Sequence, residues 1–371
     1  MVQREVRVAR RAVLAGGLAV SAVGFAGLPA SAAAPRVGGR AAAPSISSTS
    51  DWDARDASGE IEVLDSKPTK IIVHHTATPN SDDTSQSHAF ELSRQIQDYH
   101  MDTNGWSDTG QNFTNSRGGH LMEGRHKSLA ALQGGSQHVK GAHAGEQNSV
   151  SLGIENEGTY TEASVPGSLW ESLVSLCSYM VSQYGIEPGE IYGHRDYMST
   201  ACPGDVLYAR LPELRESVGA ALGLAVVQPV TWPLLRPGAQ GPSVSALQML
   251  LGARGAVVPV DGVFGESTQR ASAGVVAERA GSGPSCFGSR VAEPGLFGGL
   301  AWESVTPVLG AGARGEAVRA VQVLLTSRGR YVPANGVFGD RMVSVVREFQ
   351  AASGLAVTGV VDREGWLRLL G

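Results

Sequence analysis

An internal repeat in the C-terminal third most constrains the fold of this 371-residue chain. Sliding that third against itself with an offset of 74 residues, which places Gly238 on Gly312, aligns glycines and apolar residues without a gap. The remaining aligned pairs are Gly241/Gly315, Leu247/Val321, Gln248/Gln322, Leu250/Leu324, Leu251/Leu325, Gly262/Gly336, Val263/Val337, Phe264/Phe338 and Gly265/Gly339. The apolar spacing predicts two all-α units of three helices each, repeat 1 over 230–305 and repeat 2 over 306–371.

The two copies diverge after this shared pattern. Phe349-Gln350 of repeat 2 corresponds to Val275-Val276 of repeat 1, and repeat 1 carries an extra Gly/Ser/Pro-rich insertion around Cys286. We therefore expect repeat 2 to keep the function of the unit better than repeat 1.

The first 32 residues have the features of an export signal. A basic stretch that includes Arg10-Arg11 precedes an apolar run and the small-residue site Ala30-Ser31-Ala32. The arginine pair resembles a twin-arginine signal, with a general secretory signal as the alternative. The following residues 33–50 are rich in Ala, Gly, Ser and Pro, which is typical of a flexible linker. We expect a secreted bacterial protein associated with the cell wall.

Charge and composition restrict the partners of the exported chain. Residues 1–32 contain four arginines and one glutamate, so their removal takes the formal charge from −5 to about −8. An acidic protein is a poor ligand for nucleic acid or for an anionic membrane, and no later segment has the roughly 20 consecutive apolar residues that span a bilayer. We expect a soluble monomer that binds neither nucleic acid nor membrane after signal removal.

Residues 51–222 have the pattern of an α/β domain with a mixed central sheet flanked by helices. Lys70 to His75 reads as a short buried strand and Val150 to Ile154 as another. Helices are predicted over 85–100 and 168–184, and Ser168 and Glu171 have the spacing of a capping box. Cys177 falls in the apolar stripe of the second helix and is predicted to be a core residue.

Two stretches of this domain combine residue types that bind metals. Residues 71–78 read IIVHHTAT and residues 193–204 read GHRDYMSTACPG. A catalytic zinc site needs three protein ligands and one open position, and two neutral imidazoles with one thiolate meet that need. A single histidine at a strand end is more often structural. The combination of His74, His194 and Cys202 nevertheless indicates a metal site.

The ordered motifs of residues 65–210 resemble those of the zinc-dependent N-acetylmuramoyl-L-alanine amidases and peptidoglycan recognition proteins. They are HHTA, WSDTGQNF (106–113), GGHLMEGR (118–125), GAHAGEQN (141–148), SLGIENEG (151–158) and GHRDYMSTACPGD. The resemblance implies one Zn²⁺ ion held by His74, His194 and Cys202. It makes His75 a neighbour of the metal rather than a ligand.

The same resemblance suggests which residues assist the metal. Glu155 matches a catalytic glutamate and is the favoured general acid/base, with Glu157 as the competitor because it lies two residues on and points to the same face. His143 resembles a substrate-contacting or oxyanion-supporting position, although it can also be a surface loop histidine. Thr200 stands where some members have lysine and can still donate to an oxyanion.

Substrate binding is assigned to Gln111, Asn112 and His75. Gln111 departs from the family, because many active members have a tyrosine there, and an amide cannot act as a phenolic acid. The resemblance implies hydrolysis of the amide between N-acetylmuramic acid and L-alanine in peptidoglycan. Two alternatives stay open: a recognition protein that binds muropeptides without cutting them, and a zinc peptidase that acts within the stem peptide.

The two C-terminal repeats resemble the peptidoglycan-binding domain of wall hydrolases, chiefly through the Gly-Val-Phe-Gly loops at 262–265 and 336–339. Weak binding units tethered to a catalyst raise its local concentration on a polymer. The alternative is that the repeats are small structural bundles.

Overall fold

The computed structural model of the chain describes residues 39–279, 293 and 295–371. The expected export signal, the first part of the expected linker and Cys286 lie outside these residues.

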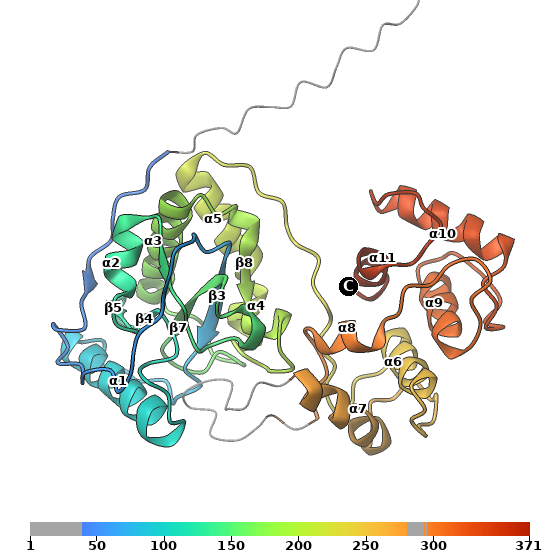
Figure 1. Ribbon diagram of the computed structural model, residues 1–371, viewed down its shortest axis with the longest axis horizontal. Coiled ribbons are helices and arrows are strands. Elements are labelled where there is room, and N and C mark those ends of the chain that lie inside the picture. The colour runs from blue at the N-terminus through green and yellow to red at the C-terminus, as the bar shows by residue number, and fades with distance from the viewer. Residues whose placement is uncertain (1–38, 280–292, 294) are drawn as a thin grey trace, which may run out of the picture. The chain divides into compact units, whose positions relative to one another are not determined.

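A six-stranded mixed sheet forms the centre of the first part of the described chain (Figure 1), in the order β1-β5-β4-β7-β3-β8. Strand β7 pairs in parallel with β3 and β4, β3 pairs in parallel with β8, and β4 and β5 are antiparallel. A separate two-stranded sheet pairs β2 with β6. The strands are β1 (Ile46–Ser47), β2 (Val63–Leu64), β3 (Lys70–His75), β4 (Phe113–Asn115), β5 (Leu121–Glu123), β6 (His138–Val139), β7 (Ser151–Asn156) and β8 (Ile191–Gly193).

Helices pack against one face of the sheet. Alternate residues of β3 and β7, among them Ile71, Val73 and Ile154, join a buried cluster with the apolar stripes of α3 and α5. Cys177 of α3 is fully buried in this cluster, as predicted. The helices of this part are α1 (Gln86–Asp98), α2 (Ser128–Gly134), α3 (Gly167–Tyr184), α4 (Asp205–Ala209) and α5 (Leu211–Leu222).

The opposite face of the sheet carries polar residues at the carboxyl ends of the central strands. His74 of β3 is in register with Glu155 of β7, and Glu155 is in register with Thr114 of β4. Register partners in a parallel sheet point to the same side, so these three side chains share one face. Helix α1 packs toward the β5 side of that face, where Ala89 meets Met122 and Trp52.

Two local predictions are wrong. Part of the expected flexible linker is a strand: Ile46–Ser47 forms β1, which pairs in parallel with β5 because Ile46 packs against the main cluster. The predicted capping box of α3 is absent, because this helix begins at Gly167 with Pro166 as its N-cap. The Ser168 hydroxyl instead donates to the carbonyl of Arg117.

Residues 230–371 form the predicted helical units. Repeat 1 contains α6 (Pro242–Ala253), α7 (Glu266–Arg279) and α8 (Ala301–Val305), and repeat 2 contains α9 (Glu316–Ser327), α10 (Asp340–Ala352) and α11 (Arg363–Leu370). Their buried residues form one cluster that spans both copies, with α6 against α9 (Figure 1). Three short helices bury little apolar surface alone, which explains why the copies share a core.

A glutamine in each repeat clamps the glycine loop that follows its helix. The Gln322 amide donates to Asn335 Oδ1 at 3.0 Å and to the Val337 carbonyl at 3.1 Å, and accepts from Gly336 N at 2.9 Å. Gln248 makes the same contacts with Asp261, Val263 and Gly262. This equivalence confirms at atomic level that the aligned Gln and Gly residues have the same structural role.

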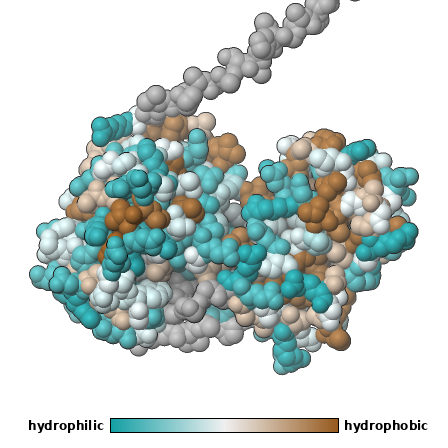
Figure 2. All heavy atoms as spheres, viewed as in Figure 1, coloured by the Kyte–Doolittle hydropathy of each residue, from teal (hydrophilic) through white to brown (hydrophobic). Residues whose placement is uncertain are grey.

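The predicted fold class is therefore confirmed: a mixed sheet flanked by helices, followed by two three-helix units. On the face shown in Figure 2, hydrophilic residues predominate and hydrophobic residues form separate patches. None of the helices in the described ranges is long and apolar enough to cross a membrane.

Candidate metal centre

Three metal-ligating side chains from distant parts of the sequence meet at the end of β3. One nitrogen each of His74 and His194 and the sulfur of Cys202 all lie within 4.8 Å of one another, and all three residues are buried. His74 lies in β3, His194 directly follows β8, and Cys202 ends the loop after it. Because β3 and β8 are parallel neighbours, their carboxyl ends bring the ligands to one point.

The orientation of the donor atoms fits a metal ion. The His74 Nδ1 atom lies 3.7 Å from Cys202 Sγ, and the His194 Nδ1 atom is buried with no hydrogen-bond partner. The other nitrogen of His194, Nε2, lies 3.1 Å from the sulfur of Met198. A buried nitrogen without a partner is costly unless something else binds it, and an ion between the three donors supplies that partner.

Burial keeps both imidazoles neutral, the state in which a nitrogen lone pair is available to a metal. Desolvation, followed by repulsion from His194, His143 and His75, holds the pKa of His74 well below the usual 6.5. Desolvation, with smaller effects of His143 and His75, lowers the pKa of His194 to about 3. The site thus carries no cationic imidazole that would repel a divalent ion.

Backbone contacts hold the loop that carries two of the ligands. Arg195 N donates to the Cys202 carbonyl at 3.0 Å, and Gly193 N donates to Asp196 Oδ2 at 2.8 Å. Cys202 N donates to Thr200 Oγ1 at 3.1 Å, and His75 N donates to Cys202 Sγ at 3.4 Å. Thr200 thus lies two residues before Cys202, and its hydroxyl oxygen accepts from the backbone nitrogen of that candidate ligand.

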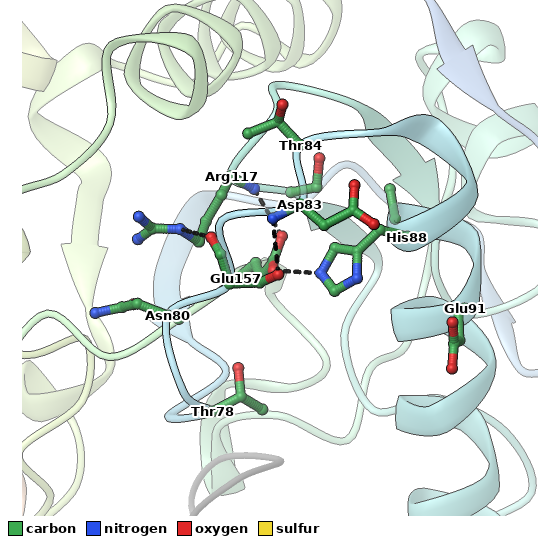
Figure 3. Close-up of polar contacts among 12 residues, drawn as sticks. Thr78, Asn80, Asp83, Thr84, His88, Glu91, Arg117 and Glu157 are labelled. Atoms are coloured by element: carbon green, nitrogen blue, oxygen red, sulfur yellow. Dashed lines mark hydrogen bonds and ion pairs between the residues drawn. The ribbon is translucent and has the colours of Figure 1, made fainter.

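The two competing glutamates have different surroundings. Glu155 lies in register with the ligand His74 on the adjacent strand, so both side chains point to the metal face. Glu157 accepts from His88 Nε2 at 2.7 Å and from Arg117 N at 2.8 Å (Figure 3). Its carboxylate is 2% exposed and joins the first turn of α1 to the loop after β4. Glu157 is thus held in a structural contact away from the ligands.

Not all the residues assigned to substrate binding face the metal. Asn112 is fully buried. Its amide donates to Ser128 Oγ and to the Val139 carbonyl and accepts from Gly153 N. The His75 ring lies on the other face of β3, accepts from Tyr160 N at 3.3 Å, and has a pKa lowered to about 4 by burial and then by Arg195. The side chains of both residues are engaged in contacts within the fold, and their role in substrate binding stays a prediction.

Gln111 and His143 are buried on the metal side of the sheet. Gln111 donates to Thr114 Oγ1 at 2.9 Å, and Thr114 shares the face of Glu155. The Nδ1 atom of His143 lies 3.1 Å from His74 Nε2, so His143 is not a surface loop histidine. Burial, with a smaller effect of Arg125, lowers its pKa to about 3.

Sequence reasoning missed several neighbours of the candidate ligands and of Glu157. Asn156 donates to the carbonyl of His74 at 2.8 Å, and Met198 contacts His194. Met198 lies four residues after His194, a spacing typical of side chains on one helical turn, and that spacing was the available signal. His88 of α1 and Arg117 of the loop after β4 carried no such signal, because these segments meet only in the folded chain.

This arrangement can hold a divalent ion with two nitrogens and one sulfur, beside a buried carboxylate and a hydroxyl. Such a set is suited to metal-assisted hydrolysis of a bond to a carbonyl carbon.

Two parts of the chain match known protein families. Residues 64–205 match the family described as N-acetylmuramoyl-L-alanine amidase, and residues 314–369 match the one described as peptidoglycan binding domain.

Peptidoglycan-recognition protein SC2 of Drosophila simulans is 37% identical over 160 residues, which are 43% of this chain and 80% of that protein. The N-acetylmuramoyl-L-alanine amidase of Homo sapiens is 31% identical over 167 residues, 44% of this chain and 27% of that protein. The solved structure of wild-type Drosophila PGRP-LB is 28% identical, covers 45% of this chain and 92% of that one, and superposes with a TM-score of 0.40.

Proposed function

Because the chain belongs to the family of peptidoglycan-recognition proteins and N-acetylmuramoyl-L-alanine amidases, we propose that it is a zinc-dependent amidase. Its substrate is the amide bond between N-acetylmuramic acid and L-alanine in peptidoglycan. The observation that carries this proposal is the convergence of His74, His194 and Cys202 within 4.8 Å. A recognition protein without activity has no need of a complete ligand set, so the cysteine favours catalysis.

The ligand set suits one zinc ion, which needs three protein donors in a catalytic site and keeps a further position open. When bound, zinc supplies a Lewis acid that polarises an amide carbonyl and lowers the pKa of a nearby water.

The residues around the ligands move and hold protons. The Glu155 carboxylate takes the proton of the attacking water and delivers it to the nitrogen of the leaving L-alanine, since it points to the same side as His74. The Thr200 hydroxyl, held in the loop by its contact with Cys202 N, donates to the oxygen that gains charge. In other enzymes, removal of one such donor raises the activation free energy by about 2.7–4 kcal/mol.

The helical repeats have a supporting function in this proposal. They bind the peptidoglycan polymer and keep the catalytic part close to many cleavable bonds, which raises its effective concentration. The second repeat matches the family described as peptidoglycan binding domain and keeps Phe349-Gln350. It is therefore the stronger binder of the two. The protein acts outside the cytoplasm, on the cell wall, where this substrate occurs.

The test is mass spectrometry of peptidoglycan digested by the full chain loaded with zinc. Cleavage as proposed releases peptides that begin with a free L-alanine amine and leaves an intact lactyl carboxylate on muramic acid. Cys202→Ser serves as the matched control and is expected to release none. Wall that is bound but uncut by the zinc-loaded protein identifies a recognition protein. Fragments with the lactyl amide intact and a cut stem peptide identify a peptidase.

A further inference from the structure

His143 lies directly behind the ligand His74. The Nε2 atom of His74 is 3.1 Å from His143 Nδ1, and the two rings meet edge to face at 89° with centroids 5.1 Å apart. The opposite nitrogen of His74, Nδ1, faces Cys202 Sγ at 3.7 Å. One nitrogen of His74 thus faces the other ligands and the other faces His143.

Counting hydrogens on these rings fixes their tautomers. A neutral imidazole carries one N–H, and a nitrogen that binds a metal must offer its lone pair. If Nδ1 of His74 is the ligand, its Nε2 carries the hydrogen and needs an acceptor. The acceptor within reach is His143 Nδ1, which must then offer a lone pair. The neutral His143 ring therefore carries its hydrogen on Nε2.

The fold holds His143 in the orientation that this role requires. Its backbone N–H and that of Ala144 both donate to Asn148 Oδ1, at 2.8 and 2.9 Å. Its ring fits against two glycines: a Cβ atom at Gly141 would lie 2.4 Å from the ring, and one at Gly153 would lie 2.5 Å from it. Any other residue at either glycine would displace the ring from His74.

We propose that His143 is a positioning residue that accepts the Nε2 hydrogen of His74 and so presents His74 Nδ1 to the metal. The inference rests on the proposed zinc site and replaces a substrate-contacting role for His143. Partners behind metal-bound histidines orient the ring and raise ligand basicity, and their loss typically weakens metal binding by about 10- to 100-fold.

The other histidine ligand, His194, has a different partner behind its ring. The Nε2 atom of His194 faces Met198 Sδ at 3.1 Å, and a thioether is only a weak acceptor. The two ligands therefore depend on their outer partners to different degrees. Loss of the His143 ring affects the metal strongly, whereas loss of the Met198 sulfur affects it little.

The experiment measures zinc affinity by competition with a chelator, and the absorption spectrum after cobalt substitution. It compares the full chain with three variants and with the ligand variant His194→Ala. His143→Leu removes the acceptor and is expected to weaken zinc binding by roughly 10- to 100-fold and to shift the cobalt bands. His143→Asn places an amide oxygen near the lost Nδ1 and is expected to keep most of the affinity. Met198→Leu is the matched control and is expected to bind zinc like the wild type.

The outcomes separate this inference from the proposed function. A wild type that binds no zinc would overturn the zinc site and this inference together. A wild type that binds zinc, with His143→Leu equally tight and spectrally unchanged, overturns only the role of His143. If His143→Leu does not fold, His143→Asn decides: retained affinity supports the inference, and affinity as low as that of a ligand variant such as His194→Ala contradicts it.

Discussion

His74 and Glu155 lie opposite each other on the parallel strands β3 and β7, in register and on the same face of the sheet. A proposed metal ligand and a proposed proton carrier are thereby fixed by backbone hydrogen bonds of a central sheet. Sites on regular elements hold their geometry more closely than sites on loops. The register predicts that a change at position 155 affects chemistry without affecting metal binding.

We expect Glu155→Gln to lower kcat by about 10²- to 10⁴-fold, because an amide cannot take up the proton of the attacking water. Zinc content should stay at the wild-type value, since Glu155 is not one of the three ligands. The measurement is kcat on soluble muropeptides together with metal analysis of the same sample. A variant with near wild-type kcat would assign the proton transfer to another group.

Glu157→Gln is the matched change two residues along the chain. Glu157 accepts from both His88 and Arg117, so the amide leaves one of these buried contacts without an acceptor. We expect a loss of about 1–3 kcal/mol in the free energy of unfolding, with kcat nearly unchanged. Urea denaturation and a kinetic assay check both parts. A large fall in kcat at full stability would return Glu157 to the candidates for acid/base catalysis.

A third glutamine, Gln350 of α10, holds a glycine loop in the same way and predicts coupling between the two repeats. Gln350 donates to the Val360 carbonyl at 2.8 Å and accepts from Gly359 N at 2.8 Å. Gln350→Leu leaves Gly359 N without its acceptor and leaves the Val360 carbonyl with the Thr358 hydroxyl alone, which costs about 1–3 kcal/mol for a group that stays buried without a partner. Because α6 and α9 share one core, amide hydrogen exchange should become faster in both helices. Faster exchange in α9 alone would indicate that the repeats unfold separately.

A buried histidine outside the metal centre predicts the pH dependence of stability. Burial and, less strongly, Arg125 lower the pKa of His100 to about 3, against 6.5 when unfolded. Between these values the unfolded chain binds one more proton than the folded chain, so stability falls as the pH falls through this window. The slope contributed is up to about 1.4 kcal/mol per pH unit, and it vanishes above pH 6.5.

The variant His100→Gln should remove that contribution. Urea denaturation of chelator-treated protein at several values from pH 4 to 7 gives the slope of unfolding free energy against pH for both proteins. We expect a shallower slope in the variant below pH 6.5 and parallel curves above it. Equal slopes throughout would show that His100 is protonated in the folded chain.

The sequence predicted what depends on local pattern. The β-branched run before His74 predicted β3 with its observed bounds, and the apolar spacing of the C-terminal third predicted that its two units are helical. The three ligands were predicted from chemistry and resemblance, and the structure brings them together. Strand β7 begins and ends within two residues of its prediction.

The sequence could not predict what depends on contacts between distant segments. The contact of His143 with His74 joins residues 69 positions apart, and no local pattern encodes it. The contacts of Asn112 with Val139 of β6 and Gly153 of β7 likewise join segments that are distant in the sequence. The shared core of the repeats was missed for the same reason, since a pattern shows each apolar stripe but not its partner.

The most direct test of the metal centre is zinc-edge X-ray absorption of the full chain loaded with one zinc ion. Two histidines, one cysteine and one light ligand predict a four-coordinate ion with one sulfur at about 2.3 Å and two imidazole nitrogens at about 2.0–2.1 Å. A first shell without sulfur, or with six oxygen or nitrogen ligands, would show that Cys202 does not bind the metal and would contradict the site.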